Sequence, residues 1–432
     1  MTDREQQIIE LIKREVKPAL GCTEPIAVAL AVAKAVEVLE SKYSFDRLAA
    51  DFKIDVAVSG NILKNGMGVG VPGTGMIGLH IAAALGAVCG KSEYGLEVLH
   101  DLDDRSIARA KGIVADEAVN ISIADTPHKL YVSATVSADG TTAGAVIEDC
   151  HDHIVKTLLE DHVIFDCENS CGGEDADSSD CGITIREIME FAENSDFEDI
   201  KFILGDRDLN LALAKEGLRG CYGLCVGRTI RRDSGKTFGN SFLTYAMSLT
   251  AAASDARMAG CTLPAMSNSG SGNQGITVSM PVIAYAEHYG IDDEKLSRAL
   301  ILSNLVAIHI KHYLGALSAL CGCVVASTGA ACGITWLKGG NYWQICATVK
   351  NMIGNITGMV CDGAKVGCAM KVASGVSSAI QSSMLALDNH FASEHDGIID
   401  SDIERTIENL GRIGSVGMEQ TDEVILDIML NK

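Results

Sequence analysis

The sequence predicts an α+β protein with two domains: a mixed α/β N-terminal domain that contains antiparallel strands, and an all-helical C-terminal domain. The chain has 432 residues, more than a single hydrophobic core usually supports. Short alternating and β-branched runs, which are typical of strands, occur in the first half of the chain. After about residue 240 they disappear, and apolar and small residues recur at helical spacing between Gly-rich turns. The expected domains are therefore residues 1–240 and 241–432.

The first elements are expected to be two helices and a strand. Residues 5–16 and 25–40 carry apolar positions at helical spacing, and Pro25 stands where a helix usually begins. Residues 52–59 alternate apolar and polar side chains, as a half-buried strand does. A Gly-rich run then leads into an apolar helix at residues 76–89. This order of elements indicates a mixed α and β domain.

Antiparallel hairpins are expected between residues 118 and 154. Here β-branched runs such as 129–137 and 142–148 are separated by turn residues. The next stretch, residues 167–181, is acidic and contains paired glycines and paired serines. Because it has too few apolar side chains to bury, we expect an exposed loop there.

The composition narrows the range of partners. The formal net charge is -22 and the isoelectric point is near 4.8, so no broad basic surface is expected to neutralise nucleic-acid phosphates or anionic lipids. The N-terminal residues lack the basic and apolar regions of a secretory signal. The 15 cysteines are therefore expected to be thiols in the cytoplasm rather than disulfides. We expect no nucleic-acid partner and no membrane partner.

One stretch, residues 315–337, favours a membrane protein because it is uncharged and long enough to cross a bilayer. Its residues are mostly small, however, and small or hydroxyl-bearing side chains insert into a bilayer less well than Leu, Ile and Phe. A buried helix is the favoured interpretation, and a membrane carrier is the alternative.

Three cysteines are candidate ligands of a metal centre. Cys361 and Cys368 flank a turn-rich loop that can bring both sulfurs to one point, and Cys321 lies in the same helical domain. Structural zinc sites have four ligands, commonly in C-x2-C pairs, and the sequence has no such pair, so an iron-sulfur cluster is the better fit. The alternative is that these thiols are small buried core residues.

A fourth cysteine, Cys22, stands at the start of an expected helix in the segment Gly-Cys-Thr-Glu-Pro, residues 21–25. Backbone N–H groups and the helix dipole stabilise a thiolate at such a position. Cys22 is therefore a candidate catalytic base or nucleophile. The alternative is an inert cysteine beside ordinary turn residues.

A polar loop precedes the apolar helix expected at residues 276–288, and its amides suit a substrate carboxylate. It lacks the Lys-Ser/Thr ending of a P-loop, which argues against a nucleotide. A plain interhelical turn is the alternative. The candidate substrate-binding residues in this loop are Ser267, Asn268, Ser269, Gly270, Ser271 and Asn273.

Other polar positions have both a functional and a structural interpretation. Arg257 is a candidate bidentate clamp for the same carboxylate, or it pairs with a neighbouring acid such as Asp255. The Gly-rich loop at residues 61–75 precedes a helix and either faces an anion or is a connector. His309 and His312 are acid–base groups or, as we favour, satisfy a helix surface.

Taken as a set, residues 21–25, 267–275, 317–321 and 359–371 resemble the signature segments of the L-cysteine desulfidase family, and the resemblance runs nearly end to end. In its helical C-terminal part that family is similar to the α-chain of iron-sulfur L-serine dehydratases. The resemblance implies a helical cluster-binding domain of that type and a lyase.

The resemblance also implies roles for individual residues. Cys321, Cys361 and Cys368 would bind a [4Fe-4S] cluster with one iron open to substrate, and Cys22 would accept the α-proton. The nearby Cys323 leaves the choice of Cys321 open.

The implied reaction is β-elimination of L-cysteine to pyruvate, ammonia and sulfide. An L-serine dehydratase with the same site is the nearest alternative, and a non-catalytic cluster-binding sensor is an alternative of another class. The expected partner is a small amino-acid substrate, and a homodimer is possible.

Overall fold

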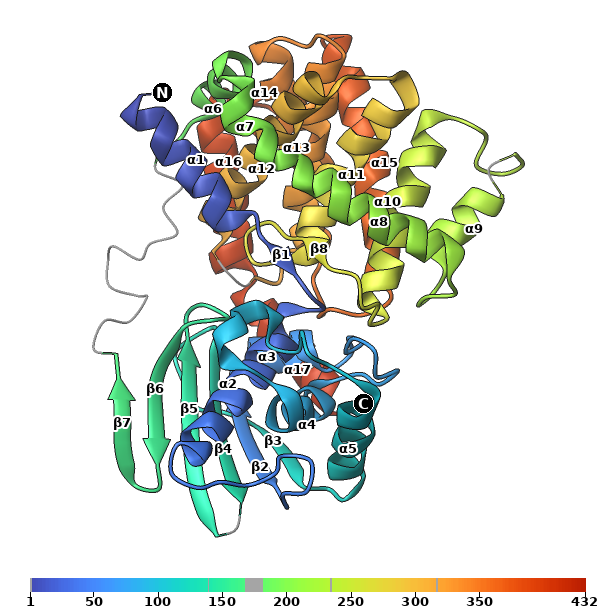
Figure 1. Ribbon diagram of the computed structural model, residues 1–432. Coiled ribbons are helices and arrows are strands. Elements are labelled where there is room, and N and C mark those ends of the chain that lie inside the picture. The colour runs from blue at the N-terminus through green and yellow to red at the C-terminus, as the bar shows by residue number, and fades with distance from the viewer. Residues whose placement is uncertain (1, 139, 168–181, 234, 316–317) are drawn as a thin grey trace.

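The computed structural model describes residues 2–138, 140–167, 182–233, 235–315 and 318–432. It confirms the α+β class, because a sheet with its covering helices lies below a part built almost wholly of helices (Figure 1). We call these the sheet part and the helical part. The stretch expected to be an exposed acidic loop lies, from residue 168 to residue 181, outside the described residues.

The sheet part contains, within the described residues, a six-stranded sheet in the order β3-β2-β4-β5-β6-β7. Strands β2 and β3 pair in parallel, and the other neighbouring pairs are antiparallel, which confirms the expected hairpins. Its elements are α2 (Thr23–Glu40), β2 (Lys53–Val58), α3 (Gly60–Gly66), α4 (Leu79–Cys89), the 3-10 helix η1 (Ser92–Glu97), α5 (Asp104–Ala115), β3 (Val119–Ile123), β4 (Tyr131–Ala138), β5 (Thr141–Glu148), β6 (Ile154–Leu159) and β7 (His162–Asp166).

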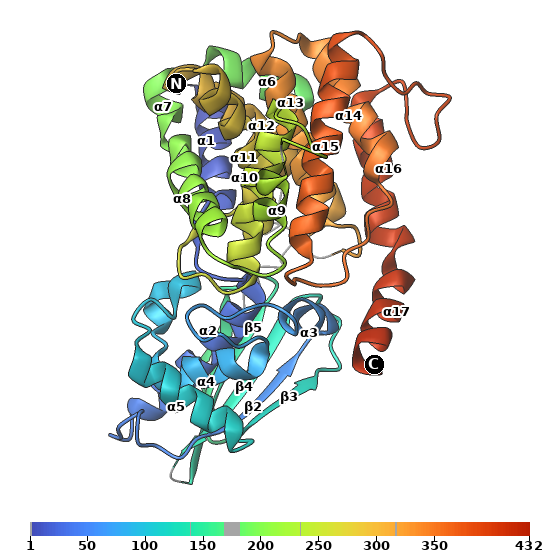
Figure 2. The same cartoon turned by 90° about the vertical axis from the view of Figure 1, so that its right-hand side faces the viewer.

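Strands β2, β4 and β6 each bury one face, because buried and more exposed residues alternate along them. In β4, for example, Val132, Ala134 and Val136 are buried, and the residues between them are more exposed. Helix α2 packs across β4, β5 and β6, and α4 packs against α2 and the β2–β3 end of the sheet (Figure 2). The helix that carries Cys22 at its start is therefore held between the sheet and a second helix.

The helical part draws on the rest of the chain. Its elements are α1 (Asp3–Glu15), β1 (Pro18–Ala19), α6 (Ile185–Asn194), α7 (Phe197–Ile200), the 3-10 helix η2 (Lys201–Leu204), α8 (Gly205–Arg219), α9 (Val226–Arg232), α10 (Phe242–Met258), β8 (Ala265–Met266), α11 (Gly272–Tyr289), α12 (Asp293–Leu314), α13 (Gly322–Leu337), α14 (Tyr342–Ile356), α15 (Cys368–Leu387), α16 (Ile403–Arg412), the π-helical turn η3 (Ile413–Gly417) and α17 (Glu419–Leu430).

Helix α13 lies at the centre of the helical part and contains most of the uncharged stretch at residues 315–337. It packs against α11, α12, α14 and α15, so protein rather than lipid covers its apolar surface. Among the described residues, no helix combines the length and apolar character that crossing a membrane requires. Burial inside a helical bundle explains why this segment is apolar and small on all sides.

The two parts are interleaved along the chain. Apolar residues of segments 8–12 and 183–214 pack in the same core as α11, α12 and α13. Strand β1 pairs with β8 beside this core, with Pro18 opposite Met266. The chain thus starts in the helical part, crosses to the sheet part after β1 and returns after β7. The division at residue 240 into two domains stays a prediction about independent folding units.

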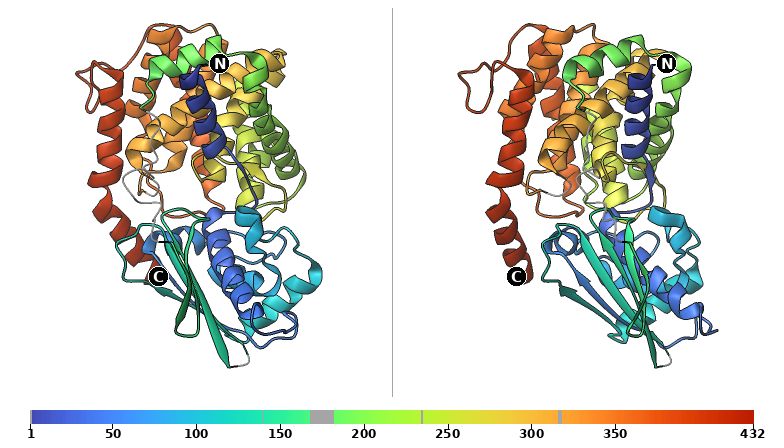
Figure 3. Two further views of the ribbon diagram at one scale, coloured as in Figure 1. Left: turned by 60° about the vertical axis from the view of Figure 1, so that its left-hand side comes forward. Right: turned by 90° about the vertical axis from the view of Figure 1, so that its left-hand side faces the viewer.

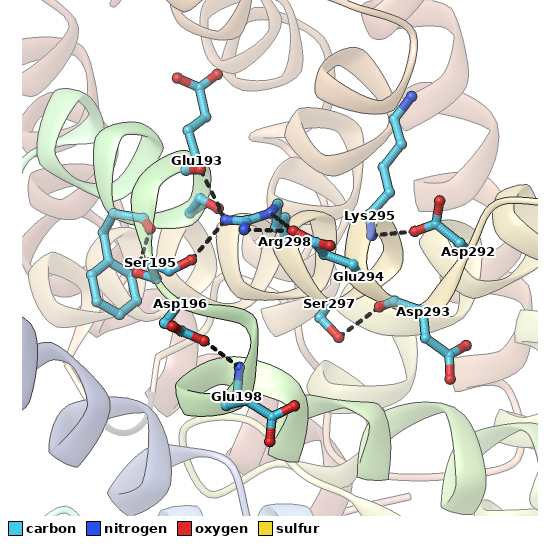
Figure 4. Close-up of polar contacts among 12 residues, drawn as sticks. Glu193, Ser195, Asp196, Glu198, Asp292, Asp293, Glu294, Lys295, Ser297 and Arg298 are labelled. Atoms are coloured by element: carbon cyan, nitrogen blue, oxygen red, sulfur yellow. Dashed lines mark hydrogen bonds and ion pairs between the residues drawn. The ribbon is translucent and has the colours of Figure 1, made fainter. Parts of the chain in front are cut away.

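Arg298 ties α12 to the end of α6 (Figure 4). Its Nη1 donates hydrogen bonds of 2.9–3.0 Å to the backbone carbonyls of Ala192, Glu193 and Ser195. Its Nη2 donates to Glu294 Oε1 at 2.8 Å. The last carbonyls of a helix have no intrahelical partner, so the guanidinium satisfies them and fixes α6 to the helical core.

The chain returns to the sheet part at its C-terminal end, where α17 extends from the helical part toward α3 (Figure 3). Lys64 of α3 is only 2% exposed and forms an ion pair with Asp422 of α17. The expectation of a loop over residues 61–75 is wrong for its first part, because residues 60–66 are helix α3. Ile62 and Lys64 are buried there, and a helix supplies the hydrogen bonds that buried backbone groups require.

Candidate functional site

A cavity of about 120 Å³ lies where the two parts meet. This is several times the space that one water molecule needs. The sheet part contributes Cys22, Thr23 and Glu24 at the start of α2 and Asn65 from α3. The helical part contributes Arg257, Ser271, Asn273, Gln274, Thr277, Cys321, Gly322, Cys323, Cys361, Gly363, Ala364, Cys368, Lys371 and Val372.

Three buried polar atoms of this lining have no hydrogen-bond partner among the described residues. They are Asn65 Oδ1, Arg257 Nε and Thr277 Oγ1. Leaving a buried donor or acceptor unpaired costs about 1–3 kcal/mol. A cavity of about 260 Å³ lies elsewhere, beside α17, but no unpaired buried atom of the described residues lines it. The small cavity is therefore the better candidate for a ligand site.

Cys22 and Glu24 form a buried pair at the start of α2. The thiol of Cys22 donates a hydrogen bond of 3.0 Å to Glu24 Oε2. Burial raises the pKa of the Cys22 thiol well above its ordinary value, the charge of Glu24 raises it further, and Arg257 opposes both. The expectation that the helix start stabilises a thiolate is therefore wrong for the resting protein, in which Cys22 is a protonated thiol.

Arg257, at the end of α10, reaches across the junction between the two parts. It is 3% exposed, and its Nη2 donates to the carbonyl of Gly21 at 2.7 Å, directly before Cys22. Asp255 is not its partner, since the Asp255 carboxylate accepts from the amide of Gly227 at 2.9 Å. Gly272 leaves room for the guanidinium, because a Cβ there would lie 2.3 Å from Arg257 Nε. The guanidinium is thus held in place while its buried Nε has no partner among the described residues.

The loop before α11 contributes to the cavity only at its end. Ser271 lines the cavity and caps α11 by accepting from the amide of Gln274, and Asn273 lines it as well. The other four candidate residues of this loop, Ser267, Asn268, Ser269 and Gly270, do not line the cavity. A direct role for these four in substrate binding stays a prediction.

These four loop residues are instead bonded to neighbouring protein groups. Ser267 donates to the Lys17 carbonyl at 2.6 Å, and Asn268 is fully buried against Asn304. The amide of Ser269 donates to the Glu15 carbonyl, and the carbonyl of Gly270 accepts from Thr23. The loop is thereby fixed to the chain segment that leads to Cys22.

Cys321 and Cys361 come together through a short backbone bridge. The amide of Cys321 donates to Met359 O at 2.9 Å, and the amide of Cys361 donates to Ala319 O at 2.6 Å. The Cys321 thiol hydrogen-bonds to Cys361, and this bond, with Lys64 and Lys371 nearby, lowers the pKa of Cys361 to about 6 against the effect of burial. Cys361 therefore favours the thiolate, the form in which cysteine binds metals.

Cys368 lies at the first residue of α15 and lines the same cavity as Cys321 and Cys361. Within the described part of the chain, no group of three or more His, Cys, Asp or Glu side chains is arranged to hold a single metal ion. The three thiols nevertheless form a soft donor set around one space, which is the ligand chemistry that iron-sulfur clusters use. The residues fit a cluster in type and location.

Several cavity residues were not among the sequence candidates. Glu24, Asn65, Gln274 and Thr277 all line the cavity. Glu24 and Gln274 lie within the two motifs that were singled out, so both could have been found there. Asn65 lies in the Gly-rich run at residues 61–75, which was also singled out, whereas Thr277 carries a weaker signal, a polar side chain within a predominantly buried helix.

The two histidines on α12 lie outside the cavity lining. His309 is 2% exposed, and its Nε2 lies 2.7 Å from Glu404 Oε2. This bond links α12 to α16 and supports a structural interpretation of His309.

Fold and site together define an α+β protein in which a sheet part and a helical part enclose thiols, a carboxylate and a guanidinium in one small cavity. This arrangement suits a small, charged ligand. The family model for the serine dehydratase alpha chain matches residues 93–427, and the chain belongs to this family. Serine dehydratase alpha chains are typically part of iron-sulfur serine dehydratases, so the family indicates a lyase-type enzyme.

Relatives of similar length match the chain over nearly its whole length. The chain is 49% identical to UPF0597 protein BF3560 of Bacteroides fragilis, over 100% of both chains. It is 49% identical to a UPF0597 protein of Oleidesulfovibrio alaskensis, over 98% of this chain and 97% of the relative. It is 44% identical to one of Porphyromonas gingivalis, over 100% and 99%. The family model begins at residue 93, so the segment with Cys22 and Glu24 lies outside its match.

Proposed function

We propose that this chain catalyses β-elimination from a small L-amino acid, with L-cysteine giving pyruvate, ammonia and sulfide. The observation that carries the proposal is a single small cavity with unpaired polar atoms beside a buried thiol–carboxylate pair. Elimination needs a cation for the substrate carboxylate, acceptors for its ammonium group and a base near the α-carbon. The lining contains candidates for each.

The carboxylate is assigned to Arg257, whose Nε is unpaired while Nη2 is fixed to Gly21. A guanidinium held in this way loses little conformational freedom when it binds a carboxylate. The ammonium group is assigned to Asn65 Oδ1 and Thr277 Oγ1, which are unpaired acceptors on the same cavity. Cys22 is assigned as the group that removes the α-proton.

Cys321, Cys361 and Cys368 are the proposed holders of a [4Fe-4S] cluster. Cys323 is less suited, because its thiol donates to the Lys371 carbonyl at 3.2 Å and packs closely against the backbone of Gly375. When bound, the cluster would supply a Lewis-acidic iron for the leaving group on the β-carbon. The protein groups named above would orient the substrate and move its α-proton.

The leaving group is hydrosulfide in the leading proposal. The resemblance of four sequence segments to L-cysteine desulfidases favours cysteine. L-Serine is the second candidate, because the chain belongs to the serine dehydratase alpha chain family. The same residues would serve either substrate, since cysteine and serine differ only in the atom that leaves the β-carbon.

Anaerobic reconstitution with iron and sulfide, followed by assays of pyruvate with L-cysteine and L-serine in parallel, tests the proposal. We expect the wild type to bind iron and sulfide in equal amounts and to form pyruvate from one or both substrates. Cys361→Ala is expected to lose the cluster, and Cys22→Ala to keep the cluster and lose turnover. Cys89→Ser, in α4 outside the cavity lining, is the control and should match the wild type.

Other outcomes would favour one of the alternative interpretations. If the wild type binds a cluster but forms no pyruvate from either substrate, the cluster-binding sensor becomes the favoured hypothesis. If the wild type binds no cluster, the three cysteines are buried core residues rather than ligands. Sedimentation of the same preparation tests the homodimer, and fractionation of cells tests the cytoplasmic location; both stay predictions.

A further inference from the structure

The carboxylate of Glu24 is buried where the sheet part and the helical part meet, and no Lys or Arg of the described residues forms an ion pair with it. It is 7% exposed and lines the cavity. Its Oε2 accepts from the Cys22 thiol at 3.0 Å and from Thr23 Oγ1 at 3.3 Å, and its Oε1 accepts from Asn65 Nδ2 at 3.0 Å. Burying a carboxylate without a paired cation costs free energy unless hydrogen bonds compensate for the lost water, and Glu24 has three such bonds.

The protonation states of the pair are opposite to those that a lone cysteine base requires. Although burial opposes ionisation, the pKa of Glu24 lies below its ordinary value, because of His151, the Cys22 hydrogen bond and Arg257. Cys22 is a thiol, as described above. A thiol must lose its own proton before its sulfur can take another. The nearest ionised acceptor for that proton is Glu24.

We propose that Glu24 is the proton acceptor for Cys22 and makes the thiol competent to remove the substrate α-proton. This inference rests on the proposed function. Glu24 acts through Cys22 and is therefore a positioning residue. Asn65 and Thr23 aim its carboxylate at the sulfur, and Arg257, through Gly21, holds the backbone before Cys22 in place.

The step balances without any further reactant. The Cα–H bond of the substrate breaks as a new S–H bond forms at Cys22, and the original thiol proton moves along the 3.0 Å hydrogen bond to Glu24 Oε2. The electron pair of the Cα–H bond becomes the second Cα–Cβ bond, and the β-substituent leaves with the electrons of its bond to Cβ. Glu24 then holds one proton, which is available to the departing anion.

Other charged groups face Glu24 and set the background for any pH dependence. They are Cys22 on its own helix end, His151 from the β5–β6 connection, Arg257 from α10 and Lys311 from α12. The tests below compare variants at each pH, so contributions of these groups that the variants share cancel.

The first test needs neither cofactor nor substrate. The rate of Cys22 alkylation by iodoacetamide is followed from pH 6 to pH 11 by mass spectrometry of the peptide that contains it, in wild type and Glu24→Gln. We expect Cys22 in Glu24→Gln to be alkylated roughly tenfold faster or more than in wild type at each pH, because the negative charge that disfavours the thiolate is gone. Glu40→Gln, at the other end of α2, should match the wild-type rate. Equal rates in Glu24→Gln and wild type would overturn the inference.

The second test uses the reconstituted enzyme. Glu24→Gln is expected to lower kcat by roughly 10²–10⁴-fold, the range for loss of a general base, with KM changed by much less. The residual rate should rise with pH as the thiolate forms. Glu24→Asp keeps a charge with a shorter reach and should retain an intermediate kcat, so the inference is tested even when Glu24→Gln does not fold. Wild-type kcat in Glu24→Gln would refute it.

The two proposals fail differently. If the proposed function is wrong, the wild type itself makes no pyruvate, while the alkylation test still decides whether Glu24 controls the Cys22 proton. If only this inference is wrong, the wild type turns over and Glu24→Gln does so equally well.

Discussion

Asp206 gives the most direct test of how burial changes the pKa of a carboxylate in the helical part. It lies on α8, is 1% exposed, and accepts through Oδ2 from Asn304 Nδ2 at 2.9 Å, while Oδ1 has no partner among the described residues. Burial raises its pKa from 3.8 to about 7, and the bond from Asn304 opposes this only in part. Asn304 also bonds Asn268, and Asn268 bonds Gln274 of the cavity lining.

The size of the effect follows from this shift. A rise of about three pKa units corresponds to about 4 kcal/mol at 1.36 kcal/mol per unit. Since the folded-state pKa is the higher one, the stabilisation by the proton is fully present below about pH 4 and is lost as the pH rises to about 7. Roughly 3 kcal/mol of it is lost between pH 5 and pH 8. Asp206→Asn cannot ionise and should not show this loss.

Urea unfolding of wild type and Asp206→Asn at pH 5, 6, 7 and 8 measures the difference. We expect the variant to gain about 3 kcal/mol of unfolding free energy relative to wild type over this range. Asp208→Asn, whose carboxylate lies on the same helix with its side chain 69% exposed, should show almost no pH-dependent difference. A difference between Asp206→Asn and wild type that is the same at every pH would refute the argument.

Three further substitutions test other contacts. Arg257→Lys keeps the charge but loses the planar donors, and KM in anaerobic kinetics should rise roughly tenfold or more; an unchanged KM would remove Arg257 from the substrate site. His309→Ala breaks the bond to Glu404 and should lower the unfolding free energy in urea by about 1–3 kcal/mol, with kcat within about twofold; a large loss of kcat would contradict its structural role. Gly275→Ala would place a Cβ 2.0 Å from Met266 O and should reduce the yield of folded protein, whereas Gly358→Ala, with open space around it, should not; equal yields would contradict this packing.

The predicted elements match the structure where the local signal is strong. The helix expected at residues 25–40 is α2, which has a long apolar run and Pro25 in its first turn. The strand expected at residues 52–59 is β2, whose apolar residues alternate. Helix α3 was missed because its burial depends on contacts distant in the sequence: Lys64, for example, and its partner Asp422 are 358 residues apart. No pattern in a short window carries that information.

The site was predictable as a set of residue types and less so as a geometry. Cys22, Arg257, Cys321, Cys361 and Cys368 were all singled out, and all line one cavity. The sequence could not indicate that the thiol of Cys22 donates to a buried carboxylate, because the pKa of a thiol at a helix start depends on what covers it. In this fold, burial and the charge of Glu24 raise the pKa of the Cys22 thiol, so its place at a helix start is not enough to make it a thiolate.

The placement of the cavity explains why its chemistry needs both parts of the chain. Cys22 and Glu24 belong to the sheet part, whereas Arg257 and the three proposed ligands belong to the helical part. The bond of 2.7 Å from Arg257 to Gly21 crosses this junction, so it joins the group assigned to the substrate carboxylate to the backbone before the proposed base. A substrate held by Arg257 is thereby placed relative to the Cys22–Glu24 pair by the same side chain, and neither part alone contains both.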